Sequence, residues 1–470
     1  MLMEFKQIYT PGLAQCSYVI GGRNACVVVD PMRNVKPYID IAASFGLPIR
    51  GIVETHLNAD FVSGHVELRE LTGATIYITK QANAEFEHYA VLDEEEFVID
   101  TLLFKMLDTP GHTPDCSIYI VSDLERGREP ALAFTGDTLL VGDAGRPDLF
   151  PEIKEHLASK LYQSLRRIEK LPDNIELYPA HGAGSLCGRA LSSKLSSTIG
   201  TEKLHNQAIL QHPEDAFVRS FLEGMPEAPD HFSRCSEINR KGAPAVSKLA
   251  KPIGYAPEEF LKLSLSGYAV VDTRDQLAFA AAHVPGSYGL SLKGNFATFS
   301  GWVLPPDKPL LLVMESPGDM PVILKALNNV GLDSVVGYLK GGMGAYAASG
   351  LETARIESIS VFEAKKRFEK EEIYLVDTRL KSEWEDGHIK CTVHIPAPDV
   401  RKKYQDLMGS KPVAFICNSG NRSLLASSLM LNLSGMKNVL NVIGGTAAWI
   451  KLGYPIETEG EYENCKIPLR

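Results

Sequence analysis

The first half of the chain alternates short apolar runs with turn-forming residues and with longer stretches of helical periodicity. Short runs bounded by glycine, proline or charged residues are typical of strands. Apolar residues at helical spacing predict helices at Lys36–Phe45 and Ile153–Leu171. The predicted strands are Ala25–Asp30, Ile52–Thr55, Ala74–Ile78, Leu102–Leu107, Ser117–Val121 and Ala131–Thr135. This order of elements predicts a layered α/β domain over residues 1–250.

The second half of the chain repeats itself at a spacing of roughly 100 residues. The segment Val271–Arg274, which reads VDTR, recurs as Val376–Arg379. Such a period is too long for a solenoid and indicates two tandem copies of a small domain. We predict these copies at 253–355 and 356–470, each with a small parallel sheet and helices on both faces. The proline-rich stretch 212–257 is interpreted as the tail of the first domain and a linker.

Composition and charge narrow the classes of function. With 470 residues, and roughly 150 residues per domain, about three domains are expected. The net charge is −10 and no basic run is present, so neither nucleic acid nor a membrane is expected as a partner. The chain shows no secretory signal and no apolar stretch of membrane-spanning length, which predicts a cytoplasmic protein. The eight scattered cysteines form no C-x-x-C pair, which favours reduced thiols over a disulfide framework.

Four residues with metal-binding side chains each follow an apolar strand. They are His56, His112, Asp137 and His181. The ends of neighbouring strands can meet at one edge of a sheet, so these side chains can converge. Any one of these histidines alone would more often be a surface or structural residue, but the joint pattern is specific.

The segment around His56 reads THLNADFVSGH and resembles the T-H-x-H-x-D-H hallmark of the metallo-β-lactamase superfamily. The resemblance implies a four-layer αββα sandwich with the metal at one edge of its two sheets. Here the second histidine of the hallmark is Asn58 and the last is Phe61. An amide is a weak ligand for a transition metal and a phenyl ring is none, so a two-zinc centre is not expected. Of the second metal site, only Asp60 and His181 remain.

The remaining set, His56, His112 and Asp137, is a facial triad of two histidines and one carboxylate, typical of non-haem Fe(II) oxygenases. Together with FTGDTLLVGDAGRPDL and PAHGAGSLCG, it resembles the persulfide dioxygenase branch of the superfamily. The resemblance implies one Fe(II) per chain. Four further residues are candidates for orienting the ligands or binding substrate, with plain scaffolding as the alternative: Asp60, His181, Arg146 and Asn58. For Arg146 the main alternative is an ion pair within its loop, and Cys16 is either a buried apolar residue or a sulfur carrier near the metal.

A second candidate site lies in the segment 412–423, which reads PVAFICNSGNRS. Cys417 follows an apolar strand and precedes a predicted helix, so helix amides would stabilise a thiolate there. Arg422 adds positive charge beside the sulfur. The loop residues predicted to surround a persulfide are Asn418, Ser419, Gly420, Asn421 and Ser423.

The number of residues between this cysteine and its arginine distinguishes sulfur transfer from the reaction of cysteine-dependent phosphatases. Four residues stand between Cys417 and Arg422, whereas cysteine-dependent phosphatases have five. The loop, with VDTR and GHI upstream, resembles that of single-domain rhodaneses. In the first copy, either Glu315 or Met314 stands opposite Cys417, depending on a one-residue gap. We therefore expect the first copy to be a catalytically inactive spacer or interaction domain.

The sequence as a whole predicts a persulfide dioxygenase fused to a sulfurtransferase. The expected small-molecule partners are a thiol persulfide, O₂, and sulfite or thiosulfate. The resemblance to the persulfide dioxygenase branch also implies a homo-oligomer, either dimer or tetramer. Cys417 would carry the sulfane sulfur between sulfite and thiosulfate. One alternative is a glyoxalase II-like thioester hydrolase with an appended rhodanese, which would need a hydroxide-generating metal site. The other is a sulfur carrier or scaffold whose first domain is inert.

Overall fold

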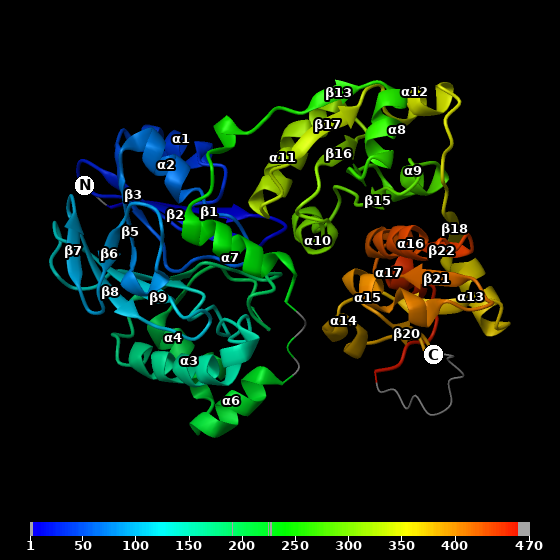
Figure 1. Cartoon of the computed structure of the whole chain (residues 1–470). Helices are drawn as coiled ribbons and strands as arrows, with labels where there is room; N and C mark the ends of the chain where they lie inside the picture. Colours follow the sequence, from blue (N-terminus) through cyan, green and yellow to red (C-terminus); the bar gives the residue numbers. More distant parts are fainter. Residues whose placement is uncertain (1–2, 190, 224, 226–227, 459–470) are drawn as a thin grey trace. The chain divides into compact units, whose positions relative to one another are not determined.

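The computed structural model describes residues 3–189, 191–223, 225 and 228–458 (Figure 1). The chain divides into two compact units. One unit comprises Met1–Leu249 and Lys325–Gly331, and the other comprises Ala250–Leu324 and Leu332–Arg470. The end of the predicted second copy, 459–470, lies outside the described residues.

The first unit contains two six-stranded sheets packed face to face. The first sheet has the order β1-β2-β3-β4-β5-β6 and the second has the order β12-β11-β10-β9-β8-β7. Their bounds are β1 Glu4–Thr10, β2 Gln15–Gly21, β3 Cys26–Val29, β4 Ile49–Val53, β5 Thr75–Thr79, β6 Tyr89–Val91, β7 Glu96–Ile99, β8 Leu102–Asp108, β9 Ser117–Asp123, β10 Leu132–Gly136, β11 Glu176–Pro179 and β12 Ser197–Thr198. Side chains of both sheets, including Tyr18, Val29, Phe104 and Phe134, form one core between them.

Helices cover the outer faces of these sheets. Helices α1 (Lys36–Phe45) and α2 (His65–Thr72) contact strands of the first sheet. Helix α3 (Lys154–Ile168) packs its apolar face, with Leu161 and Leu165, on the second sheet. The shorter helices α4 (Ile199–His205) and α5 (Gln207–Leu210) follow β12. The predicted αββα sandwich is confirmed, and each predicted strand lies within two or three residues of an observed one.

The proline-rich stretch, interpreted above as the tail of the first domain and a linker, contains two helices that belong to the first unit. These helices are α6 (Glu214–Leu222) and α7 (His231–Lys241). Phe217 and Phe221, one helical turn apart, are buried in the same core as the apolar face of α3. The prolines of this stretch stand outside both helices, where they interrupt no helical hydrogen bond.

The second unit contains two five-stranded parallel sheets with matching strand orders, β13-β17-β16-β14-β15 and β18-β22-β21-β19-β20. The strands of the first copy are β13 Ile253–Tyr255, β14 Ala269–Asp272, β15 Tyr288–Gly289, β16 Leu310–Val313 and β17 Val335–Leu339. Those of the second copy are β18 Glu357–Ser360, β19 Tyr374–Asp377, β20 Val393–His394, β21 Val413–Ile416 and β22 Val439–Ile443. The predicted pair of parallel α/β copies is therefore confirmed.

Helices accompany the strands of both copies in the same sequence order. The first copy has α8 Pro257–Leu265, α9 Gln276–Ala281, α10 Phe296–Val303, α11 Met320–Asn329 and α12 Gly342–Ala348. The second copy has α13 Val361–Glu369, α14 Lys381–Glu385, α15 Val400–Lys403, α16 Asn421–Ser434 and α17 Gly445–Lys451. Each copy has its own apolar core, one around Phe260 and Tyr346 and the other around Leu375 and Trp449.

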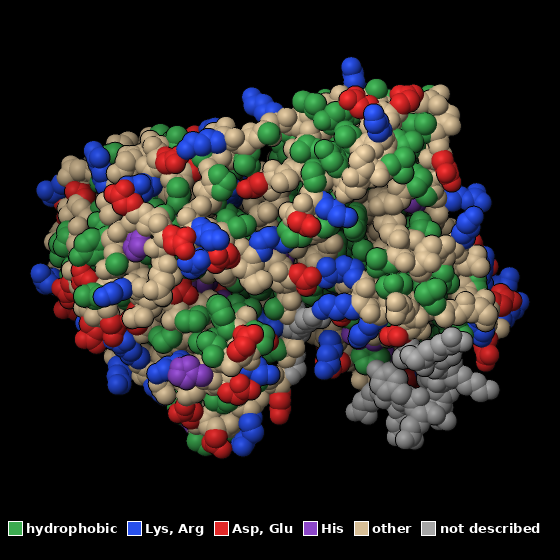
Figure 2. Space-filling model, viewed as in Figure 1, with side chains coloured by type: hydrophobic (Ala, Val, Ile, Leu, Met, Phe, Trp, Pro, Cys, Tyr) green, Lys and Arg blue, Asp and Glu red, His purple; other side chains and the backbone are tan. Residues whose placement is uncertain are grey.

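The surface carries charges of both signs. On the face shown in Figure 2, lysine and arginine side chains are interspersed with aspartate and glutamate, and no broad basic area stands out among the described residues. Within the described ranges, no helix has the length and apolar character needed to cross a bilayer.

Replacing Phe217 tests whether α6 is part of the first core. We expect Phe217→Ala to lower the free energy of unfolding of the first unit by about 3–5 kcal/mol, because it removes a buried ring and leaves a cavity. Arg219→Ala, on the exposed side of the same helix, is the matched control and is expected to behave like the wild type. Chemical denaturation of the full chain, followed by circular dichroism, gives the comparison. Equal stability of the two variants would contradict the assignment of α6 to the core.

Candidate metal centre and thiolate loop

Three side chains from three different strand ends meet in the first unit. His56 follows β4, His112 follows β8 and Asp137 follows β10, and all three are buried. Each offers one ligand atom, and these atoms lie within 4.8 Å of one another. Asp137 Oδ2 lies 3.3 Å from His112 Nε2 and 3.9 Å from His56 Nε2. The structure thus brings together the three predicted ligands.

Hydrogen bonds on the far side of each ring orient the two imidazoles. Nδ1 of His112 lies 2.8 Å from the carbonyl oxygen of Arg146, and Nδ1 of His56 lies 3.0 Å from Thr55 Oγ1. The Thr55 hydroxyl in turn donates to Asp30 Oδ2 at 2.8 Å. Both Nε2 atoms are buried without a hydrogen-bond partner among the described residues. An outer hydrogen bond at Nδ1 with a free Nε2 is the arrangement of metal-binding histidines, so this donor set fits a metal ion.

The charges of the three groups agree with this assignment. Burial lowers the pKa of His112 to about 4, which leaves the ring neutral, the form that binds metals. Burial alone would raise the pKa of Asp137, but the neighbouring histidines, His181 foremost, lower it below its usual value. Two imidazoles and one carboxylate form the donor set that suits Fe(II) with open coordination positions.

A second group of potential ligands lies beside the first. It consists of Asp60, His181 and Cys187, all buried, with ligand atoms within 4.8 Å of one another. His181 Nε2 lies 2.9 Å from Asp60 Oδ2, and its Nδ1 lies 2.8 Å from Asp137 Oδ1. Burial alone would lower the pKa of His181, but Asp137 and Asp60 raise it well above its usual value. His181 therefore links the two groups as a cation held between two carboxylates.

The two altered hallmark positions lie in the same loop. Asn58 is buried, and its Oδ1 has no hydrogen-bond partner among the described residues. The ring of Phe61 stands edge-on to that of His181, with ring centres 6.4 Å apart. A phenyl ring at this place offers no donor atom, so the second group lacks a ligand that the hallmark would supply.

Asn239 of α7 holds the loop that carries His56, and the sequence analysis missed it. Its Nδ2 donates to the carbonyl oxygens of Asn58 at 2.7 Å and Phe61 at 2.8 Å. Its Oδ1 accepts from the backbone N–H of Ser63 at 2.8 Å. One buried amide therefore satisfies three backbone groups of the metal loop. Cys187 was also missed as a potential ligand, although it stands only six residues after His181 in the quoted segment PAHGAGSLCG.

Two other candidate residues of the first unit, Arg146 and Cys16, lie in surroundings that favour a structural role. The guanidinium of Arg146 is buried and forms two hydrogen bonds of 2.7 Å with the carboxylate of Asp148. This geometry favours the ion-paired loop over direct binding of an anion. Cys16 lies in the core between the sheets, and burial raises the pKa of its thiol. Its surroundings favour the apolar interpretation.

In the second unit, Cys417 stands between β21 and α16, as predicted. Its side chain is 1% exposed, and the Gly420 N–H donates to Sγ at 3.1 Å. Ser423 Oγ lies 3.5 Å from the same sulfur and donates to Asn441 Oδ1 of β22 at 2.6 Å. The thiol thus faces a backbone N–H that can stabilise a negative charge on sulfur, while the Ser423 hydroxyl ties the loop to β22.

The loop is closed on its other side by the start of α17. The N–H groups of Thr446 and Ala447 donate to the carbonyl oxygens of Cys417 at 2.7 Å and Asn418 at 3.1 Å. Gly445 has φ +59, and a Cβ atom there would lie 2.1 Å from the Cys417 carbonyl oxygen. Glycine is therefore required at position 445 for this close approach.

The side chain of Arg422 is held in an ion pair that the sequence does not predict. Both of its terminal nitrogens pair with the carboxylate of Glu383 from α14, one of them at 2.7 Å. Burial alone would raise the pKa of Glu383, but Arg422 lowers it below its usual value. The positive charge beside the loop is thus held in place and partly compensated by Glu383.

Strand register decides which residue of the first copy replaces the cysteine. Asp272 pairs with Val313 in the first copy, as Asp377 pairs with Ile416 in the second. The residue after Val313 is Met314, which therefore stands opposite Cys417. An ion pair with the arginine two positions on, Arg274 or Arg379, recurs in both copies. Because the copy without a cysteine keeps this pair, its role is structural.

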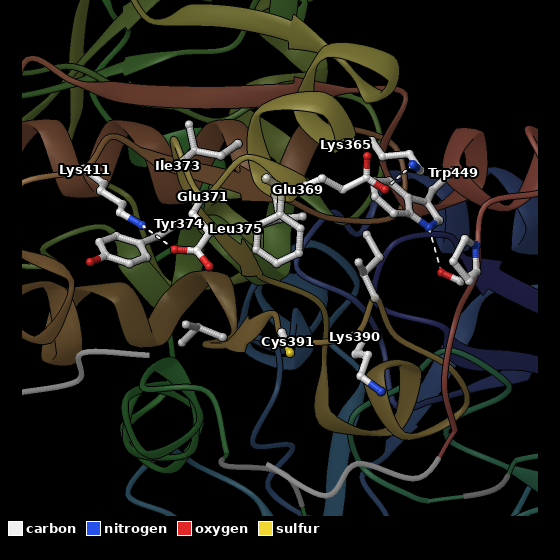
Figure 3. Close-up of a pocket in the computed structure, with 14 residues that line it drawn as sticks. Lys365, Glu369, Glu371, Ile373, Tyr374, Leu375, Lys390, Cys391, Lys411 and Trp449 are labelled. Atoms are coloured by element: carbon white, nitrogen blue, oxygen red, sulfur yellow. Dashed lines mark hydrogen bonds and ion pairs between the residues drawn. The ribbon is translucent and has the colours of Figure 1, made fainter. Parts of the chain in front are cut away.

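A separate pocket of about 520 Å³ lies in the second copy (Figure 3). Ile373, Leu375 and Trp449 are among its lining residues, and Lys411 at its rim lies 3.8 Å from Glu371. Cys391, which also lines it, is disulfide-bonded. The expectation of reduced thiols is therefore wrong for this residue, while Cys417 is a free thiol. Sequence spacing alone does not show which distant cysteines meet.

Comparisons with known proteins identify the families of the domains in both units. The model of the metallo-beta-lactamase superfamily matches residues 10–181, and the model of the rhodanese-like domain matches residues 256–349 and 360–452. The mitochondrial persulfide dioxygenase ETHE1 of Mus musculus is 30% identical over 182 residues, which cover 37% of this chain and 67% of that protein. The chain belongs to the metallo-beta-lactamase superfamily and carries two rhodanese-like domains.

Other members of the superfamily are similar to this chain over longer stretches. A hydroxyacylglutathione hydrolase of Methylococcus capsulatus is 30% identical over 241 residues, which cover 49% of this chain and 88% of that protein. The crystal structure of a metallo-beta-lactamase from Staphylococcus aureus superposes with a TM-score of 0.65 at 29% identity. It covers 72% of this chain and 98% of that chain. The metallo-beta-lactamase domain of this chain therefore has both dioxygenase and hydrolase relatives.

Asn239→Ala tests whether α7 supports the metal loop. The substitution leaves three buried backbone groups without a partner, so we expect a loss of about 3 kcal/mol of stability and a lower metal content after purification. Ser233→Ala, at an exposed position of the same helix, is the control. Metal content by inductively coupled plasma mass spectrometry and thermal unfolding are measured together. Wild-type metal content and melting temperature in Asn239→Ala would show that the loop does not depend on this amide.

Proposed function

We propose that the chain is an Fe(II)-dependent persulfide dioxygenase with rhodanese sulfurtransferase activity. The proposal is carried by one observation, the buried set of His56, His112 and Asp137 with two partnerless Nε2 atoms facing one carboxylate. The relative named persulfide dioxygenase ETHE1 and the two rhodanese-like domains support the same reading. The substrate would be the persulfide of a small thiol.

The first reaction would convert a persulfide, O₂ and water into a thiol and sulfite, with two protons released. His56, His112 and Asp137 would hold the iron, which supplies the redox chemistry that brings O₂ to the terminal sulfur. Thr55 and Arg146 orient the two rings through their oxygen atoms.

The second reaction would move a sulfane sulfur through Cys417. The thiolate attacks the outer sulfur of thiosulfate, the sulfur–sulfur bond breaks, and sulfite leaves with the bonding electron pair. Cys417 then carries a persulfide, which sulfite or another nucleophile can take up in the reverse sense. The Gly420 N–H lies where negative charge on sulfur develops.

A thioester hydrolase is the second candidate function. It is favoured by the neighbouring group of Asp60, His181 and Cys187 and by the hydroxyacylglutathione hydrolase relatives. Such a reaction would use two metal ions to generate a hydroxide. The edge-on ring of Phe61 and the ion pairs of His181 with two carboxylates argue against a second metal ion.

Metal content and O₂ uptake separate the two functions. We expect about one iron per chain and O₂ uptake with glutathione persulfide, with both lost in His112→Ala because two remaining ligands hold Fe(II) poorly. His205→Ala, an exposed histidine of the same unit, should keep both. Two zinc ions per chain with cleavage of S-lactoylglutathione, and no O₂ uptake, would establish the hydrolase instead.

Cys417→Ser tests whether the two reactions use separate sites. We expect this variant to lose thiosulfate:cyanide sulfurtransfer by at least about 10³-fold, because serine cannot form the persulfide. Its O₂ uptake with glutathione persulfide should stay close to that of the wild type. Cys26→Ala, a free buried thiol of the first unit, is the matched control and should retain both activities. Loss of O₂ uptake in Cys417→Ser would contradict independent sites.

A further inference from the structure

The first rhodanese copy packs against the helix that begins at the thiolate loop. On α16, Leu424, Ser428 and Asn432 are spaced four residues apart and so share one face. Leu424 packs with Phe279, Ala280 and Ile356. The Ser428 hydroxyl accepts from the Gly289 N–H at 3.1 Å, and Asn432 Nδ2 donates to the Ser287 carbonyl oxygen at 3.1 Å. This face of α16 continues at its start into Gly420.

Gln276, the first residue of α9, meets the loop at that point. Its Nε2 donates to the carbonyl oxygen of Ser419 at 3.4 Å. Its Oε1 is buried without a hydrogen-bond partner among the described residues, and a Cβ atom at Gly420 would lie only 2.0 Å from it. The carboxamide therefore lies directly against the Gly420 backbone.

Gly420 is the residue of the loop whose position matters most for the sulfur. Its N–H is the backbone donor to Cys417 Sγ, at 3.1 Å. Its φ of +111 is a conformation that glycine adopts easily, and a peptide flanked by glycine rotates easily as well. Gln276 packs on this glycine and binds the carbonyl oxygen of the preceding residue, so it restrains the peptide that carries the donor.

The second copy has no such group at the matching position. Lys381, the first residue of α14, corresponds to Gln276 and pairs with Glu385 on its own helix at 3.5 Å. The glutamine contact thus belongs to the surface that the first copy presents to the second. This contact is not among the internal features that the two copies have in common.

We propose that Gln276 is a positioning residue for the Cys417 loop, so that the copy without a cysteine is a working part of the sulfurtransferase site. The carboxamide keeps the Gly420 N–H directed at the sulfur and thereby favours the thiolate. This inference rests on the proposed function only in calling the site a sulfurtransferase. The restraint on the loop itself does not depend on which acceptor is used.

The test compares the full chain with Gln276→Ala, Gln276→Glu and Leu277→Ala. Leu277 lies next to Gln276 on α9 and is 51% exposed, so it is the matched control. The readout is the pH dependence of Cys417 alkylation by iodoacetamide, followed by mass spectrometry of the peptide. We expect Gln276→Ala to slow alkylation at pH 7 by about threefold to tenfold and to move the midpoint to higher pH, as for loss of part of one hydrogen bond to an anion. Gln276→Glu should shift the midpoint further in the same direction, because it brings a negative charge to the loop.

Thiosulfate:cyanide sulfurtransfer and O₂ uptake complete the test. We expect kcat/KM for sulfurtransfer to fall with the alkylation rate in both Gln276 variants, while O₂ uptake and the Leu277→Ala profile match the wild type. Alkylation curves of wild type and Gln276→Ala that coincide, or an equal shift in Leu277→Ala, would overturn the inference. A wild-type chain that transfers no sulfur to cyanide, but whose alkylation still depends on Gln276, would remove the proposed function and leave the inference standing.

Discussion

The structure of the first unit depends on the burial of three metal-binding groups at one point. Two imidazole Nε2 atoms without partners and a carboxylate oxygen lie together where water does not reach. A buried polar atom left without a partner costs about 1–3 kcal/mol, so such a cluster persists only if something compensates it. A bound cation would do so. Three strand ends supply the three groups, and Thr55, Arg146 and Asn239 hold their rings and loops in place.

Much of this arrangement could be predicted from the sequence because it depends on patterns among residues that are close together in the chain. The apolar runs that end at His56, His112 and Asp137 predict strands, and a loop after a strand puts its first side chain at the edge of the sheet. The same logic placed Cys417 between β21 and α16. The repeat of VDTR predicted two similar parallel sheets, because a repeated segment with the same polar pair adopts the same fold twice.

What escaped prediction depends on contacts between residues far apart in the chain. Asn239 stands in a proline-rich stretch with no motif, and only the folded chain shows that its amide meets the loop of Asn58, 181 residues earlier. The edge strand β1 and the polar start of β2 lack a clear alternation, so their pairing is set by neighbours rather than by pattern. The disulfide of Cys391 and the contact of Gln276 with Ser419 are likewise set by tertiary structure.

The two proposed reactions share a chemical species, and this gives the fusion a physical reason. Sulfite would leave the dioxygenase site and is the acceptor that turns a Cys417 persulfide into thiosulfate. A tether between two sites raises the effective concentration of each near the other without requiring a direct contact between the units.

Such coupling works only if the Cys417 loop already holds its reactive conformation when sulfite arrives. In the second unit, contacts from both rhodanese copies hold this loop in place. Helix α17 of the second copy closes the loop on one side, and the first copy, which has no cysteine at this position, covers the face of α16 that leads to Gly420. A domain with methionine in place of its nucleophile can therefore be retained for packing and loop geometry, properties that need no reactive side chain of its own.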